Sequence, residues 1–255
     1  MSHITPPLAF DQRHTTFQLP EVVSFRESRD GTCKWLLDAG EGSLVDAVLI
    51  PDRVRNTLCV SSQIGCMLDC SFCSTGKLGF NGNLPATTIV AQALIANAHL
   101  DDLAFGISKR RVTISTADVV PAIYRLAEDT DVALAISLHA PDDELRNKLV
   151  PINCKYAIAE LLDACLHYVD HLGDSRKLVI EYTLMKGVDD TQAHAHALAL
   201  LLRDVHCKVN LIPFNPFPTA GYERPTPAAV RAFQTALMQL GYAISQVSPG
   251  ASSSA

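Results

Sequence analysis

The sequence predicts an α/β fold: a partial, open barrel of parallel strands, preceded by a small β hairpin. Short β-branched or apolar runs alternate with segments whose apolar residues recur every three or four positions, an order typical of parallel strands joined by helices. The strand runs are apolar almost throughout, as expected for strands that are buried on both faces. Five such strands are too few for a closed eight-stranded barrel, so we expect an open one.

The chain is expected to begin with a loose lead-in, residues 1–20, which is polar, contains prolines and shows no periodicity. Two short apolar runs follow, residues 34–38 and 44–50. The segment between them, residues 39–43, is rich in glycine and supplies the turn. These segments predict the β hairpin.

Beyond the hairpin, strands and helices are expected to alternate. The helical pattern is clearest at Leu161, Leu162 and Cys165, where apolar residues recur at helical spacing. Because the carboxyl ends of parallel strands meet at one edge of a sheet, residues just after the strands are candidates for a functional site. The predicted strands are residues 57–63, 111–116, 132–139, 177–184 and 207–214, and the predicted helices are residues 87–99, 119–128, 158–172, 192–204 and 226–241.

The 255 residues suffice for one sizeable domain, which we place at residues 21–242, followed by a low-complexity tail at residues 243–255. A net charge of −6 gives no general attraction to nucleic acid, so an RNA contact would need a local basic patch. Residues 109–111, with Arg53, Arg55 and Lys77, are the candidate patch, and a solvated surface is the alternative. Eight cysteines are too dilute for a secreted disulfide scaffold. No signal peptide or membrane-length apolar run is visible, and we expect a soluble, cytoplasmic protein.

Three cysteines, Cys66, Cys70 and Cys73, stand in one short loop with the spacing C-x3-C-x2-C. A loop this tight can direct three thiolates at one inorganic centre, and three ligands on a four-iron cluster leave one iron open. Zinc more often takes four ligands in two separated pairs, although Cys59 or a distant histidine offers a fourth ligand. Ordinary buried cysteines are the simplest alternative. The spacing favours an iron–sulfur cluster.

Several long motifs follow one another in and around this loop, at residues 57–66, 70–76, 79–81, 108–116, 135–141, 150–153 and 210–218. In this order they closely resemble the radical-SAM methyltransferases of the RlmN type, and the resemblance extends from about Leu19 to Tyr242. Such enzymes methylate carbon 2 of an adenine in 23S ribosomal RNA and in some transfer RNAs. The resemblance implies a [4Fe-4S] cluster on Cys66, Cys70 and Cys73, S-adenosylmethionine as second cofactor, and ribosomal or transfer RNA as partner.

The resemblance also implies roles for residues at the predicted strand ends. Its S-adenosylmethionine contacts correspond to Ser115, Ser137, Leu138, His139 and Asn215. For the two serines, the alternative is ordinary hydrogen bonding at a strand end. For His139, the alternative is a buried histidine whose hydrogen bonds are satisfied within the protein.

Two further positions correspond to catalytic residues of the family. Asp46 stands where the family has a glutamate that accepts a proton from the adenine adduct. Because aspartate is shorter by one methylene, its carboxylate is withdrawn, and a displacement of about an ångström can cost roughly 100-fold in rate. A solvated acid on a hairpin strand is the alternative. Cys59 resembles the cysteine that pairs transiently with the methyl-carrying cysteine.

Three family features have no match in the sequence: the N-terminal helical RNA-binding domain, the Gly-Glu-Pro motif of the second barrel strand, and the methyl-accepting cysteine near the C-terminus. Both sides of the junction after His99 match the family, so we expect an internal deletion of roughly 30 residues, about one βα unit. The sequence therefore leaves three functions open: a methyltransferase, an inactive relative that at most binds a cluster, or a non-enzymatic metal-binding module that contacts RNA.

Overall fold

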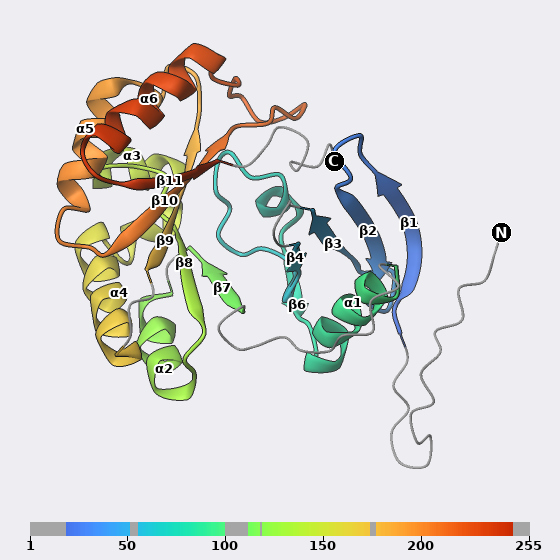
Figure 1. Ribbon diagram of the computed structural model, residues 1–255. Helices are drawn as coiled ribbons and strands as arrows, with labels where there is room; N and C mark the ends of the chain where they lie inside the picture. Colours follow the sequence, from blue (N-terminus) through green and yellow to red (C-terminus); the bar gives the residue numbers. More distant parts are fainter. Residues whose placement is uncertain (1–18, 52–55, 100–111, 118, 174–176, 247–255) are drawn as a thin grey trace. The chain divides into compact units, whose positions relative to one another are not determined.

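The computed structural model describes most of the chain between Leu19 and Gln246, and Figure 1 shows its elements. The predicted core at residues 21–242 is divided between two compact units. The first unit comprises Met1–Cys66 and Leu78–Phe105, and the second comprises Met67–Lys77 and Gly106–Ala255. The described residues are 19–51, 56–99, 112–117, 119–173 and 177–246, so most of the predicted lead-in and the end of the predicted tail lie outside them.

The first unit is built on an antiparallel sheet in the order β1-β2-β3-β4. Its strands are β1 (Glu21–Glu27), β2 (Cys33–Asp38), β3 (Leu44–Ile50) and β4 (Thr57–Val60). The predicted hairpin is confirmed as β2 and β3, which pair antiparallel. Buried and half-buried residues alternate along both strands, as expected when one face of a sheet covers a core. That core joins the sheet to α1 (Ala86–His99), which confirms the first predicted helix.

The prediction that residues 57–63 form a strand of the parallel sheet is wrong. Residues 57–60 form β4, which pairs antiparallel with β3 and belongs to the first unit. The connection from Ile50 to Thr57 is far shorter than the dozen or more residues that a parallel crossover needs. Residues 63–65 form β5 (Gln63–Gly65), which pairs with β6 (Phe80–Asn83) on the other side of the cysteine loop.

The second unit contains a five-stranded sheet in the order β11-β10-β9-β8-β7, in which every neighbouring pair is parallel. The four remaining predicted strands are confirmed, with their ends shifted slightly. The fifth strand, β11, falls in the predicted low-complexity tail, and the prediction of a tail is therefore wrong for residues 243–246. The strands are β7 (Thr113–Thr116), β8 (Ala133–Ser137), β9 (Leu178–Leu184), β10 (Cys207–Pro213) and β11 (Ala243–Gln246).

The helices of the second unit lie together on one side of this sheet (Figure 1). Four of them, α2 (Val120–Asp129), α4 (Ile158–Leu172), α5 (Gln192–Leu201) and α6 (Pro227–Gln239), confirm the predicted helices. A short helix, α3 (Asp143–Leu149), was not predicted. No helix in the described ranges is long and apolar enough to cross a membrane.

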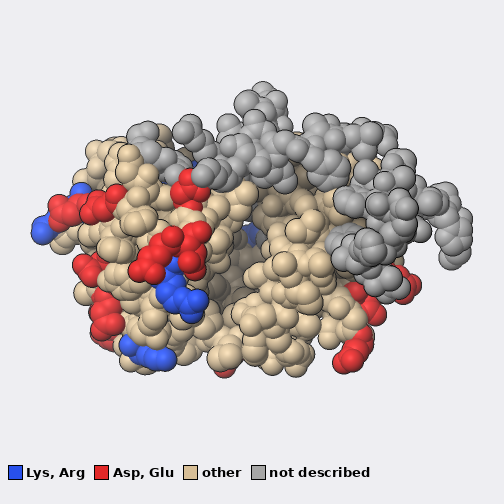
Figure 2. Space-filling model, turned by 90° about the horizontal axis from the view of Figure 1, so that it is seen from below, with Lys and Arg blue, Asp and Glu red and all other residues tan. Residues whose placement is uncertain are grey.

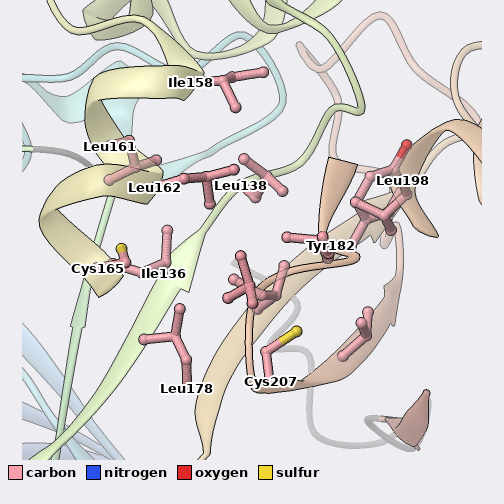
Figure 3. Close-up of a cluster of buried hydrophobic side chains, with 14 of the residues drawn as sticks. Ile136, Leu138, Ile158, Leu161, Leu162, Cys165, Leu178, Tyr182, Leu198 and Cys207 are labelled. Atoms are coloured by element: carbon pink, nitrogen blue, oxygen red, sulfur yellow. The ribbon is translucent and has the colours of Figure 1, made fainter. Parts of the chain in front are cut away.

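The core of the second unit lies between this layer of helices and the sheet (Figure 3). Ile136 and Leu138 from the β8 end, with Leu178 from β9, meet Leu161 and Cys165 of α4 there. Since successive strand residues point to opposite faces, the residues between them in sequence face away from the helices. That second face carries polar side chains at the middle of the sheet, and it holds the candidate site.

Candidate functional site

The cysteine loop begins with a glycine that no other residue could replace without strain. Gly65 has a φ of +71°, and a Cβ on it would stand 1.8 Å from the carbonyl oxygen of Gly79. That oxygen also accepts a hydrogen bond of 2.9 Å from the N–H of Cys66. The close approach of two backbone segments therefore requires glycine at position 65, and it fixes the chain direction at the first cysteine.

The second part of the loop is anchored within the second unit. The N–H of Cys73 donates to the carbonyl of Cys70 at 3.1 Å, which places both cysteines on one tight turn. The N–H of Ser71 donates to the carbonyl of Leu149 at the end of α3, 3.0 Å away. Asp69, with a φ of +46°, forms an ion pair of 2.6 Å with Lys77.

The loop offers thiol ligands of the expected type and spacing. Cys70 is buried, whereas Cys66 and Cys73 are half-buried. The donor chemistry fits an iron–sulfur cluster, because thiolates are the usual cluster ligands. Within the described ranges, however, no three His, Cys, Asp or Glu side chains are gathered as they would be around a metal ion. Cluster binding by Cys66, Cys70 and Cys73 therefore stays a prediction.

Ser115 and Ser137 are brought together by a third side chain, Glu181 of β9. The hydroxyl of Ser115 on β7 donates to Oε2 of Glu181 at 3.3 Å, and the hydroxyl of Ser137 on β8 donates to the same oxygen at 3.4 Å. Burial raises the pKa of the Glu181 carboxyl, while the two serine hydrogen bonds lower it. Three adjacent strands thus contribute to one polar cluster on the face opposite the helices.

His139 follows β8 and is buried, with a φ of +60°. Its Nδ1 accepts a hydrogen bond of 3.1 Å from the N–H of Thr183, which assigns the ring proton to Nε2. Burial, reinforced by the nearby positive charge of Arg146, lowers the pKa of His139 to about 3. The ring is therefore neutral at neutral pH. Phe72 of the cysteine loop packs edge-on against it, with ring centroids 4.8 Å apart.

The backbone around His139 is held by Arg146, a fully buried residue of α3. Its Nε donates to the carbonyl of Leu138 at 2.8 Å, and its second terminal nitrogen donates to the carbonyl of Ser137 at 3.0 Å. Its first terminal nitrogen donates to Oδ1 of Asn153 at 2.8 Å. Leu138 itself is buried in the helix-side core. Arg146 thus fixes the strand end that carries Ser137, Leu138 and His139.

Asn215 follows β10, as predicted. Its Oδ1 accepts a hydrogen bond of 3.1 Å from a terminal nitrogen of Arg224, whose Nε donates to the carbonyl of Phe214 at 3.0 Å. Arg224 therefore orients the amide of Asn215. The cofactor contacts expected of Ser115, Ser137, Leu138, His139 and Asn215 stay predictions.

The two proposed catalytic residues, Asp46 and Cys59, both belong to the first unit. Asp46 lies on β3, where its Oδ2 forms an ion pair of 3.0 Å with Nζ of Lys34. Its Oδ1 is buried and has no hydrogen-bond partner among the described residues. Cys59 lies on β4, where its side chain is exposed.

A basic surface for RNA is not visible in the described part of the chain. The predicted patch at residues 109–111 lies outside it, as do Arg53 and Arg55. On the face drawn in Figure 2, basic side chains of the described residues are fewer than acidic ones and do not gather into a basic patch.

Glu181, Arg146 and Arg224 are residues at this site that the sequence did not indicate. For Glu181 a signal existed, because it is the one charged residue of β9 and stands two positions from Val179 and Thr183, on the strand face away from the helices. Arg146 has no such signal. It lies in a short polar segment that resembles a solvated surface, and only the folded structure shows that its side chain is buried.

Comparisons with known proteins find the same family that the sequence motifs resemble. No protein-family model matches the chain. The chain is 51% identical to the dual-specificity RNA methyltransferase RlmN of Marinobacter nauticus, over 88% of this chain and 70% of that protein. It is 50% identical to RlmN of Marinomonas sp. strain MWYL1, over 88% and 71%. The crystal structure of a radical SAM methyltransferase from Sphaerobacter thermophilus superposes with a TM-score of 0.83 at 37% identity, covering 90% of this chain and 77% of that one.

The alignment with the Marinobacter protein also reveals residues that are missing here. It spans 259 positions, whereas 88% of the 255 residues of this chain is about 224 residues. About 35 aligned positions of the relative thus have no counterpart in this chain. Their total is close to the internal deletion that the sequence predicts.

Proposed function

Because the chain belongs to the RlmN family of radical-SAM RNA methyltransferases, we propose that it binds S-adenosylmethionine at the carboxyl edge of its parallel sheet and uses it to modify an adenine of RNA. The observation that carries this proposal is the placement of Ser115, Ser137 and His139 at or just after the ends of the adjacent strands β7 and β8. Ligands of parallel α/β sheets collect at that edge.

In this proposal, the thiolates of Cys66, Cys70 and Cys73 hold a [4Fe-4S] cluster with one open iron. When bound, the cluster supplies the electron that cleaves S-adenosylmethionine to a radical. The remaining work belongs to the chain. Glycine at position 65 and the turn from Cys70 to Cys73 orient the ligand loop. Phe72, packed on His139, keeps an apolar side chain between the loop and the strand end, and so limits access of water.

The cofactor contacts follow from the hydrogen-bonding capacity of each group. Ser115 and Ser137 present hydroxyls that can donate or accept. His139 presents a neutral ring with its proton on Nε2, since Nδ1 already accepts from Thr183. The amide of Asn215, oriented by Arg224, suits a base edge that has both a donor and an acceptor. Leu138 can offer only the second lone pair of its carbonyl oxygen, because its side chain faces the core, its N–H donates to the carbonyl of Glu181 and its carbonyl already accepts from Arg146.

We place the proton acceptor at Asp46, and we assign Cys59 to the family position whose cysteine pairs transiently with the methyl-carrying cysteine. The support for Asp46 is its Oδ1, a buried acceptor that has no donor among the described residues. The support for Cys59 is its exposed position on β4. The relatives are named dual-specificity RNA methyltransferases, and we take carbon 2 of adenine in 23S ribosomal RNA and transfer RNA as the proposed target. Such substrates would place the chain in the cytoplasm.

A second candidate function is favoured by the missing segment. We propose that the positions absent here include one βα unit of the barrel, with its Gly-Glu-Pro motif. The edge position of β7 among the described strands supports this, because β7 would lie next to the lost strand. Loss of that motif would remove a charge-assisted contact to S-adenosylmethionine, which is worth about 1.5–3 kcal/mol. The chain would then be an inactive relative that binds a cluster without completing methyl transfer.

The cluster is tested first, by anaerobic reconstitution with iron and sulfide. We expect charge-transfer absorbance and about four irons per chain in the wild type. Cys66→Ala, Cys70→Ala and Cys73→Ala should each lose both. Cys154→Ala, an exposed cysteine outside the motif, should retain them. Stoichiometric zinc without iron uptake would refute the cluster and support a metal-binding module instead.

The reaction is tested next, with S-adenosylmethionine, a reductant and ribosomal or transfer RNA added to the reconstituted protein. Turnover to methylated adenine supports the methyltransferase. Formation of 5′-deoxyadenosine without methylated adenine selects the second candidate. If neither product forms although the cluster is intact, the methyltransferase is refuted and the inactive relative is supported.

A further inference from the structure

The polar face of the parallel sheet centres on Glu181, to which the family resemblance assigns no role. Register pairs Ser137 with Glu181, Glu181 with Asn210, and Asn210 with Ser245. Register partners in neighbouring parallel strands point to the same side of a sheet. These side chains therefore form one polar row across β8, β9, β10 and β11, on the face opposite the helices.

Glu181 differs from the rest of the row because its side chain is charged, and it is half-buried. Its pKa responds to burial and to the hydroxyls of Ser115 and Ser137, and to no cation in the described part of the chain. A carboxylate in such surroundings lacks compensation, and further hydrogen-bond donors would stabilise it. The two hydroxyls that it has are 3.3 and 3.4 Å away, beyond the usual distance for an O–H···O hydrogen bond.

These contacts indicate which kind of ligand group the carboxylate accepts. Oε2 of Glu181 already accepts long hydrogen bonds from two hydroxyls. A ligand hydroxyl could replace a serine hydroxyl as donor without a change of charge at the site. A pair of neighbouring hydroxyls matches the two oxygens of one carboxylate. Acidic side chains at strand edges bind ribose hydroxyls in other nucleotide-binding sheets.

We propose that Glu181 is a ligand-binding residue of this site and that its carboxylate accepts hydrogen bonds from the ribose hydroxyls of an adenosyl ligand. This inference rests on the proposed function, since it takes the ligand to be S-adenosylmethionine or its products. In the ligand-bound state, Ser115 and Ser137 turn toward the ligand, and Glu181 keeps its hydrogen bonds by exchanging a serine hydroxyl for a ribose hydroxyl.

The test is equilibrium binding of four ligands to the full chain: S-adenosylhomocysteine, its 2′-deoxy and 3′-deoxy forms, and 5′-methylthioadenosine. The variant is Glu181→Gln, which preserves the shape and removes the charge. Glu181→Ala serves as a second variant, and thermal melting establishes that each is folded. The control is Ser245→Ala, which removes a hydroxyl of the same row that donates to Asn210 at 3.1 Å, two strands from Glu181.

We expect Glu181→Gln to weaken the binding of S-adenosylhomocysteine and of 5′-methylthioadenosine equally, by about tenfold or more. This is the loss expected when hydrogen bonds to a charged group are removed. The loss of affinity caused by Glu181→Gln should be smaller for at least one deoxy ligand, because that ligand lacks the hydroxyl that binds the carboxylate. Ser245→Ala should bind all four ligands as the wild type does.

Three results would overturn the inference while leaving the proposed function intact: no penalty for Glu181→Gln; a full penalty with both deoxy ligands; or a penalty with S-adenosylhomocysteine but none with 5′-methylthioadenosine. The third result would assign the carboxylate to the amino group of the ligand. Failure of the wild type itself to bind S-adenosylhomocysteine would instead overturn the proposed function, and the inference with it.

Discussion

At the scale of single residues, the site depends on two buried groups of opposite behaviour. Arg146 is buried in its charged form and donates hydrogen bonds to several backbone carbonyls. His139 is buried in its neutral form, because burial lowers its pKa. Glu181 stands between these extremes, half-buried and loosely hydrogen-bonded. Side chains with direct motif matches could be located from the sequence. Those that support them from a distance in sequence, such as Arg146, could not, because burial of a single polar residue depends on the packing of several elements.

His139 should make stability depend on pH. Its pKa is about 3 in the folded state, below the ordinary value of 6.5. Between these values the unfolded chain binds a proton that the folded chain does not, so stability should fall as pH falls from 6.5 toward 3, by about 1 kcal/mol per pH unit. His139→Asn retains an acceptor, tolerates the positive φ and does not titrate. Urea unfolding at several pH values should show a shallower dependence in His139→Asn, and equal slopes would contradict this assignment.

Arg146 should tolerate no substitution, not even lysine. Lysine cannot reproduce the planar fork that reaches the carbonyls of Ser137 and Leu138 together, and each buried carbonyl left without a donor costs about 1–3 kcal/mol. We expect Arg146→Lys to lower the free energy of unfolding by about 3 kcal/mol.

The matched control for Arg146 is Lys148→Ala on the same helix. Lys148 pairs with Glu144 at 2.9 Å at the exposed surface, and loss of such a pair changes stability by less than about 0.5 kcal/mol. Chemical denaturation of both variants checks the contrast. Similar, small losses in both would show that the carbonyl contacts of Arg146 contribute little.

At the scale of elements, the sequence predicted the helices and strands whose residues follow a clear periodicity. It failed for strands that are defined by the strand with which they pair. The long helices and the strands β7 to β10 were identified because their sequence patterns extend over several residues. Strand β4 was assigned to the wrong sheet, since a short apolar run does not reveal its partner. Strand β11 was missed because four residues of mixed polarity, Ala243–Gln246, become a strand only by pairing with β10. Helix α3 is short and polar, and its burial is carried by Arg146 and Leu149.

The loop between β5 and β6 offers a sharp test of steric demand. Gly65 and Gly79 have nearly equal φ values, +71° and +72°, but a Cβ would meet a carbonyl at Gly65 and nothing within 4 Å at Gly79. Gly79→Ala should therefore cost only the left-handed backbone strain, about 1–2 kcal/mol. Gly65→Ala should cost clearly more and should also impair iron uptake. Thermal melting and iron analysis decide this, and equal melting temperatures would contradict the close approach.

At the scale of the whole molecule, the sequence predicted one core, whereas the chain forms two compact units, each with its own hydrophobic cluster. One boundary between the two units lies within the cysteine loop, between Cys66 and Met67. The amino-acid composition does not change there, so the sequence could not indicate this boundary.

The effect of the proposed deletion on the affinity for S-adenosylmethionine can be measured. We expect a chimera that carries the unmatched residues of the Marinobacter relative after His99 to bind S-adenosylmethionine at least about tenfold more tightly than the wild type, through the regained charge-assisted contact. An insertion of equal length made of glycine and serine is the control. Equal affinity in the chimera, the control and the wild type would show that the lost residues do not contribute to cofactor binding.

The edge position of β7 has a consequence for how the protein behaves in solution. Thr113–Thr116 is an outermost strand of the described sheet, and Ile114 on it is 37% exposed. A strand of this kind presents a row of backbone donors and acceptors that another extended chain can use as a template. Among the described strands, β7 is thus a place where we expect strand addition, and self-association through β7 should increase with protein concentration.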